Sequence, residues 1–166
     1  MEEDCVQIRH AYLEEYDAAT LIASKAYNHL KSIISPSLWP VFEKSLLDAT
    51  NLKDGGELLV AVDSVHILGV AVYRAPNSEP NSTIRRNWSS LTVLGVLPEY
   101  RKRGIGMKLL NVCLDLARAD KAKCFGVFVN PIMSDATSFF RSAGFKRNSH
   151  LQIISGSKYL QFRLAL

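Results

Sequence analysis

One run of residues, from 96 to 110, constrains the fold of this 166-residue chain more than any other, and it reads VLPEYRKRGIGMKLL. The run begins as the apolar end of a strand, turns at Pro98, carries three consecutive cations, and enters an amphipathic helix through Gly104 and Gly106. At the first turn of a helix, unpaired N–H groups and the helix dipole attract an anion. Glycine lets the backbone come close to that anion because it has no Cβ atom. The run therefore predicts a strand–turn–helix unit that binds a pyrophosphate.

Two well-known phosphate loops do not fit this run. A nucleotide-hydrolase loop continues from its last glycine with Lys and Ser or Thr, whereas Gly106 is followed by Met107. A dinucleotide-binding fingerprint needs a third glycine, where this chain has Leu109. The remaining pattern is Arg-x-x-Gly-x-Gly after a strand and a proline, and Arg101 is its first residue. An ordinary helix start with a solvated basic turn is the alternative interpretation.

The composition indicates a folded protein with a modest positive charge. Its 166 residues are 48% hydrophobic and 22% charged, which is typical of one globular domain, here residues 1–166. The formal net charge is +4, and part of it lies in residues 85–86 and 101–103. Neither cluster has interleaved aromatic residues, so the charge suits an anionic cofactor better than a nucleic acid.

The three cysteines, Cys5, Cys113 and Cys124, have no metal-binding spacing, and we expect no metal. Reduced thiols are the simplest account of them, and they favour a cytoplasmic protein. The N-terminal residues are acidic and lack the apolar core of a signal peptide, and no apolar run is long enough to span a membrane.

The order of predicted elements is strand, two helices, three strands, helix, strand, helix and two strands. Apolar periodicity and turn residues predict strands over 6–9, 57–63, 66–73, 89–96, 124–129, 145–153 and 159–164. They predict helical segments over 13–27, 33–47, 105–116 and 134–143. Residues 75–87 have the composition of a loop, and loops of that length tend to be functional or mobile.

Two stretches resemble the GNAT N-acetyltransferase superfamily. The first is the Arg-x-x-Gly-x-Gly run, which resembles the family's acyl-coenzyme-A-binding motif. The second is residues 130–145, NPIMSDATSFFRSAGF, where an Asn follows the fifth strand and a helix ends in Gly-Phe. The resemblance implies an α/β (α+β mixed) fold of three layers, with a splayed mixed sheet of about seven strands flanked by about four helices. It places acyl-coenzyme A between strands 89–96 and 124–129.

The resemblance also implies the residues that bind the cofactor. Backbone N–H groups of Leu94, Gly95 and Val96 are expected to polarise the thioester carbonyl, with Gly95 at a β-bulge. Asn130 is expected to hydrogen-bond the pantetheine arm or a neighbouring backbone group, and Ala136 to pack beside it. The expected contacts of coenzyme A are Val96, Arg101, Lys102, Arg103, Gly104, Ile105, Gly106, Met107, Asn130, Ala136 and Phe140.

The proton-transfer groups are not evident. Many relatives carry a tyrosine that protonates the departing thiolate, and its position here is Phe140, which has no proton to give. A thiol of pKa about 8.5 leaves as thiolate at pH 7 for about 2 kcal/mol, so the loss slows transfer without preventing it. Tyr73, Tyr159 and water are the alternatives considered for this role.

No carboxylate lies in strand 89–96, where some protein-acetylating relatives carry a glutamate base near Ser90. The candidates for the base are His150, since histidine titrates near neutrality, and water chains or acidic residues of the first helices. The acidic residues are Glu14, Glu15, Asp17 and Glu43. Deprotonation at pH 7 costs roughly 4.6 kcal/mol for a lysine of pKa about 10.4, but only about 1.4 kcal/mol for an α-amine of pKa about 8.

The sequence therefore predicts an N-acetyltransferase that transfers an acetyl group from acetyl-coenzyme A directly to an amine. Without a general base, an amine of low pKa is easier to deprotonate and acetylate, and this favours the amine of a small molecule. A protein N-terminus or lysine is the first alternative, and a coenzyme-A-binding regulatory domain without catalysis is the second. The resemblance also allows a homodimer.

Overall fold

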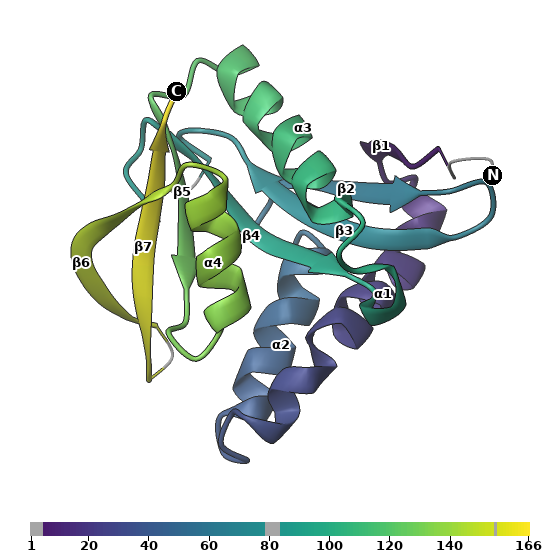
Figure 1. Ribbon diagram of the computed structural model, residues 1–166, viewed down its shortest axis with the longest axis horizontal. Helices are drawn as coiled ribbons and strands as arrows, with labels where there is room; N and C mark the ends of the chain where they lie inside the picture. The colour runs from purple at the N-terminus through teal and green to yellow at the C-terminus, as the bar shows by residue number, and fades with distance from the viewer. Residues whose placement is uncertain (1–4, 79–83, 155) are drawn as a thin grey trace.

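The computed structural model describes residues 5–78, 84–154 and 156–166, and these form one mixed sheet with helices on both faces (Figure 1). Its strands are β1 (Gln7–His10), β2 (Glu57–Val62), β3 (Ile67–Arg74), β4 (Trp88–Val96), β5 (Cys124–Val129), β6 (Lys146–Ile154) and β7 (Ser157–Ala165). Its α-helices are α1 (Tyr16–Tyr27), α2 (Trp39–Thr50), α3 (Ile105–Ala119) and α4 (Ser134–Ser142). Short 3-10 helices cover Leu13–Glu15, Asn28–Ser32 and Pro98–Tyr100.

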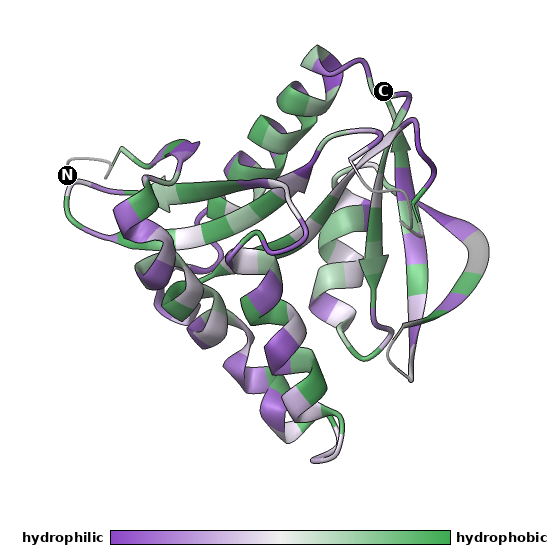
Figure 2. Ribbon diagram, turned by 180° about the vertical axis from the view of Figure 1, so that it is seen from behind, coloured by the Kyte–Doolittle hydropathy of each residue, from purple (hydrophilic) through white to green (hydrophobic). Residues whose placement is uncertain are grey.

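The sheet order is β1-β2-β3-β4-β5-β7-β6, and every pair is antiparallel except β4 with β5. One apolar cluster joins the sheet to α3 and α4, and a second joins the other face to α1 and α2. Figure 2 shows apolar residues along the central strands and both polar and apolar residues on α1 and α2. The predicted three-layer mixed fold is confirmed.

The sheet divides between β4 and β5. Their parallel pairing runs from Trp88 with Cys124 to Leu91 with Val127 and then stops. From residue 92 onward, β4 stays with β3, while β5 stays with β7 as far as Val129. The two halves of the sheet therefore separate into a fork, as the resemblance predicts.

The bulge in β4 lies at Thr92, because Val72 pairs with Val93 while the next residue, Tyr73, pairs with Leu91. The predicted bulge at Gly95 is wrong, since Gly95 pairs in regular register with Val70. The bulge coincides with the start of the fork. An extra residue increases local twist, which turns the end of β4 away from β5.

The predicted helical region 33–47 is shifted, because prolines restrict the chain there. Pro40 lies in the first turn of α2, where its missing N–H has no helix partner to lose. The predicted loop 75–87 is described only in part, since residues 79–83 lie outside the described residues. None of the helices in the described part of the chain is long and apolar enough to cross a lipid bilayer.

Candidate active site

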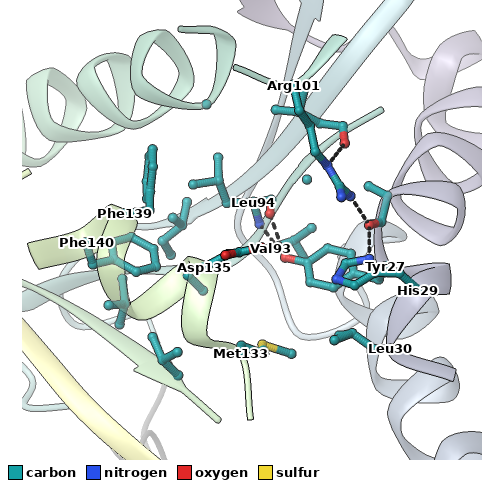
Figure 3. Close-up of a pocket in the computed structure, with 18 of the residues that line it drawn as sticks. Tyr27, His29, Leu30, Val93, Leu94, Arg101, Met133, Asp135, Phe139 and Phe140 are labelled. Atoms are coloured by element: carbon teal, nitrogen blue, oxygen red, sulfur yellow. Dashed lines mark hydrogen bonds between the residues drawn. The ribbon is translucent and has the colours of Figure 1, made fainter. Parts of the chain in front are cut away.

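A cavity of about 490 Å³ lies in the fork between β4 and β5. The unpaired end of β4 and the end of β5 form two walls, and the N-terminal turns of α3 and α4 and the C-terminal end of α1 close it (Figure 3). Most of the residues predicted to bind coenzyme A line this cavity. They are Val96, Arg101, Lys102, Gly104, Ile105, Gly106, Met107, Ala136 and Phe140.

The loop predicted to bind the pyrophosphate, called the phosphate loop below, runs from Arg101 to the first turn of α3. Gly104 precedes α3 with φ +78°, a left-handed conformation that disfavours other residues. A Cβ atom on Gly104 would find no protein atom within 4 Å, so the space beside it is open. The first hydrogen bond of the helix runs from Lys108 N–H to Gly104 C=O at 3.0 Å. The N–H groups of residues 105–107 precede that bond and face the anion-binding end of the helix.

The three cations of the loop take different positions. The Arg101 guanidinium donates from Nη2 to the Ala26 carbonyl at 2.5 Å and from Nε to the Val96 carbonyl at 3.2 Å. It thus ties the loop to the C-terminal end of α1. Lys102 lines the cavity with a positive φ of +63°. Arg103 does not line it, and instead lies over the Tyr100 ring, 5.2 Å from its centroid.

The unpaired edge of β4 is hydrogen-bonded by side chains. Leu94 N–H donates to the Tyr27 hydroxyl at 3.0 Å, and that hydroxyl donates to the Leu94 carbonyl at 2.7 Å. Burial raises the pKa of Tyr27, while its backbone hydrogen bond with Leu94 and the Arg101 charge oppose the shift. Leu94, Gly95 and Val96 all line the cavity, as predicted.

Tyr73, one of the residues considered as the acid, lies outside this cavity. It is fully buried and bonds through its hydroxyl to Ser89 and Asp120 at 2.8 Å each. Burial raises the pKa of Tyr73 above its ordinary value, and the residue belongs to the core rather than to the cavity. His150 belongs to β6, but its side chain lies outside the described residues. None of the four acidic residues of the first helices lines the cavity.

Asn130 does not line the cofactor cavity either. Its Oδ1 accepts a hydrogen bond from Ile132 N–H at 3.1 Å, which is an Asx turn at the end of β5. Of the two partners expected for Asn130, the structure shows the neighbouring backbone group. Tyr159 lies beside Asn130, and both residues line a second cavity. Burial raises the pKa of Tyr159, and a hydrogen bond with Asn130 opposes the shift.

Phe140 lines the cavity with an apolar ring. It is buried, with 7% exposure, and its ring lies 5.2 Å from that of Phe139 and 5.3 Å from that of Phe145. The Phe139 ring packs close to Gly106, since a Cβ atom added to that glycine would lie 3.5 Å from the ring. Helix α4 is therefore packed against the phosphate loop.

Several polar side chains of the cavity were not among the predicted site residues, and three of them are Tyr27, His29 and Asp135. His29 Nδ1 lies 3.2 Å from the Ala26 carbonyl, which can only accept, so Nδ1 is the donor of this contact. Asp135 lies in the first turn of α4. The predicted helix 13–27 contained Tyr27, but no sequence pattern indicates that this helix end points into the fork.

A second cavity, of about 890 Å³, opens between α2 and the start of β7. Its walls are largely apolar, with polar groups that include Asp48, Asp54, Lys158 and Tyr159. The two cavities meet at the fork. The residues that line both are Tyr27, Ile33, Leu91, Thr92, Val93, Val127, Phe128, Ile132 and Met133.

Several solved structures share this fold. The PaiA N-acetyltransferase from Thermoplasma acidophilum, in complex with coenzyme A, has a TM-score of 0.72 and 18% identity, over 97% of this chain and 99% of that chain. A ribosomal-protein-alanine N-acetyltransferase from Brucella melitensis has a TM-score of 0.67 and 22% identity, over 96% and 99%. A GNAT family acetyltransferase from Brucella melitensis, in complex with acetyl-CoA, has a TM-score of 0.67 and 18% identity, over 98% and 89%. At these identities the likeness establishes the fold.

No curated protein matches the chain in sequence. The sequence pattern of the Acetyltransferase (GNAT) family, however, matches residues 12–145. The matched region extends from the first turn before α1 to the end of α4, and so includes the phosphate loop and both sides of the fork. This chain belongs to the Acetyltransferase (GNAT) family and is an acyl-coenzyme-A-dependent acetyltransferase.

Proposed function

We propose that the protein transfers the acetyl group of acetyl-coenzyme A to the amine of a small molecule, by direct transfer in a ternary complex. The observation that carries this proposal is the meeting of the two cavities at the fork. A cofactor in the first cavity and an acceptor in the second approach the fork from different sides. The amine then reaches the thioester without a covalent enzyme intermediate.

The first cavity suits acyl-coenzyme A. The N–H groups of residues 105–107 and the Lys102 side chain would bind the pyrophosphate, in the open space beside Gly104. Ala136 and the apolar rings of Phe139 and Phe140 line the way toward the fork. There the backbone of Leu94 supplies an N–H group that can polarise a carbonyl.

The second cavity favours a small acceptor. Its volume of about 890 Å³ lies within the usual range of small-molecule pockets, which is roughly 300–1,000 Å³. Side chains of α2 wall it, including Val41 and Phe42, whereas a protein acceptor needs an open groove with backbone edges. Its charged lining includes both signs, with Asp48 and Asp54 beside Arg74 and Lys158. An amine with an apolar body fits this lining.

His29 is the residue we infer to take the proton that the amine loses. Its Nδ1–H is held by the Ala26 carbonyl, so Nε2 is the ring nitrogen left to take that proton in the cofactor cavity. Asp135, the carboxylate in the same cavity, is the alternative acceptor. A nearby base widens the range of amines to those of higher pKa.

Free thiol release from acetyl-coenzyme A, measured with a panel of small amines and with peptides that offer an N-terminus or a lysine, tests the proposal. Small amines are expected to turn over faster than the peptides, and mass spectrometry should detect the N-acetyl product. Faster peptide turnover would favour a protein acceptor. Tight coenzyme A binding without turnover would favour a regulatory domain.

The Gly104→Glu variant is the control for the cofactor site. A carboxylate in the open space beside Gly104 would repel the pyrophosphate, so coenzyme A binding should be lost in calorimetry while circular dichroism stays native. We further propose that residues 1–166 form one domain, since β1 and β7 belong to the same sheet. The cytoplasmic location and the homodimer remain predictions from the sequence.

A further inference from the structure

The cofactor cavity holds a tyrosine hydroxyl at the β4 edge, although not at the position that the resemblance implies. Phe140 on α4 has no proton to donate. Tyr27, the last residue of α1, lines the same cavity from the opposite side (Figure 3). Its hydroxyl contacts both backbone groups of Leu94, at 3.0 Å from the nitrogen and 2.7 Å from the carbonyl oxygen.

This contact places Tyr27 at the reacting end of the cofactor. The Leu94 N–H is one of the backbone donors expected to polarise the thioester carbonyl. A thioester oxygen that accepts from the same N–H comes within hydrogen-bond distance of this nitrogen, as the phenol oxygen does in this structure at 3.0 Å. The hydroxyl therefore lies beside that carbonyl, whose carbon is bonded to the sulfur.

The rest of the residue is held firmly, so the hydroxyl cannot move far from the edge of β4. The Tyr27 ring lies 3.2 Å from the position of a Cβ on Gly95 and 5.9 Å, between centroids, from the Phe42 ring. The preceding residue, Ala26, accepts the 2.5 Å hydrogen bond from Arg101. Arg101 of the phosphate loop is therefore hydrogen-bonded to the residue that immediately precedes Tyr27.

We propose that Tyr27 donates the proton that converts the departing coenzyme A thiolate to a thiol, an inference that rests on the proposed acetyl transfer. The amine nitrogen forms a bond to the carbonyl carbon, the carbon–sulfur bond breaks, and sulfur takes the phenol proton. The proton lost by the amine nitrogen passes through His29 or water and restores the phenol. Atoms and charge balance over one turnover.

The protonation state of Tyr27 suits this role. Burial raises the pKa of Tyr27 above its ordinary value of 10.0, although the hydrogen bond with Leu94 and the Arg101 charge oppose the shift. The hydroxyl therefore carries its proton at neutral pH, where a thiolate of pKa about 8.5 still needs one.

The Tyr27→Phe variant tests the inference, because it keeps the ring that packs on Gly95 and removes only the hydroxyl. At pH 7 the turnover number should fall about thirtyfold, which corresponds to a thiol pKa 1.5 units above the pH. The deficit should shrink as the pH rises past about 8.5, where the thiolate leaves without a proton. Tyr16→Phe, on the same helix and outside both cavities, is the matched control.

A second variant separates catalysis from structure. Tyr27→Phe combined with Phe140→Tyr restores a hydroxyl to the cavity from α4, and should recover most of the lost turnover at pH 7. The affinity for coenzyme A, measured by calorimetry, should change less than threefold in both variants. A structural role of Tyr27 would instead lower turnover equally at every pH and would not be rescued from α4.

The inference is wrong if Tyr27→Phe does not lower turnover at pH 7. It is also wrong if the loss is the same at every pH, or if Phe140→Tyr does not restore turnover. If the native protein acetylates a peptide rather than a small amine, the proposed acceptor is wrong, and the same variants are compared on that peptide. If it acetylates neither, thiol release by water from bound acetyl-coenzyme A provides the comparison. The two proposals therefore fail separately.

Discussion

The backbone of Gly95 lies so close to Ala26 that a Cβ atom on the glycine would come within 2.9 Å of the Ala26 Cβ. Gly95 belongs to β4 and Ala26 to the last turn of α1, so this contact sets the distance between helix and sheet at the fork. Tyr27 reaches Leu94, and Arg101 reaches Ala26, because α1 approaches β4 this closely.

Gly95→Ala is expected to lower the free energy of unfolding by about 1–3 kcal/mol, the usual cost of overpacking. Urea denaturation measures this loss, and calorimetry should reveal weaker coenzyme A binding because the helix end moves away from the phosphate loop. Ala26→Gly removes the facing methyl group. The double variant should lose less stability than the two single losses added together, and strict additivity would show that the contact is not the cause.

Arg101→Lys is expected to weaken coenzyme A binding about tenfold, by calorimetry, although the charge is kept. A lysine cannot reproduce the two-point bonding of the guanidinium to Ala26 and Val96, so the loop loses its tie to α1. Arg103→Lys, at a cation outside the cavity, should have a smaller effect. Equal effects of the two variants would mean that the hydrogen bonds of Arg101 to Ala26 and Val96 do not contribute to coenzyme A binding.

The fold could be predicted from local patterns in the sequence. Apolar periodicity predicts the strands and helices, and the 96–110 run predicts a helix that starts at its glycines, as α3 does after Gly104. The position at which β4 and β5 separate could be predicted only from the resemblance to the GNAT superfamily. It depends on the register between β4 and β5, which the extra residue Thr92 sets.

The acid–base groups could not be predicted, because they depend on where helix ends point. Tyr27 and Tyr73 are both tyrosines of apolar segments. One meets the unpaired edge of β4, and the other is buried against Ser89 and Asp120. Nothing in the local sequence separates them. The same holds for His29, whose Nδ1 donates to a carbonyl at the end of α1.

His29→Gln is expected to lower the turnover number about a hundredfold, at the lower end of the usual contribution of a positioned base. Steady-state kinetics of acetyl transfer measure this loss. If turnover of the variant stays within twofold of native, Asp135→Asn becomes the informative change, since Asp135 is the carboxylate of the cavity.

Tyr73→Phe is expected to affect stability rather than catalysis. It removes the hydroxyl that bonds Ser89 and Asp120 in the core, and leaving the buried Ser89 with one partner fewer costs about 1–3 kcal/mol. Thermal denaturation should register the loss, while turnover at a permissive temperature stays within twofold of native. A large drop in turnover without a drop in stability would return Tyr73 to the list of proton donors.

Arg9 and Glu15 form a two-point ion pair between β1 and the start of α1, with both nitrogen–oxygen distances at 2.8 Å. The hydrogen bond from Arg9 lowers the pKa of Glu15 from 4.5 to about 2, with burial opposing and the Tyr12 backbone N–H assisting. The folded protein therefore binds this proton less readily than the unfolded chain. The pair stabilises the fold above pH 4.5, and the contribution is lost as the pH falls toward about 2.

Glu15→Gln should accordingly lower the free energy of unfolding at pH 7 by about 1 kcal/mol, a modest value because water still reaches both side chains. The difference between native protein and variant should vanish as the pH falls from 4.5 toward 2, where the native carboxylate also becomes neutral. Urea denaturation at a series of pH values measures it. Glu14→Gln, at the neighbouring carboxylate, should give a smaller difference. A Glu15→Gln difference that stays constant down to pH 2 would show that the ion pair does not stabilise the fold.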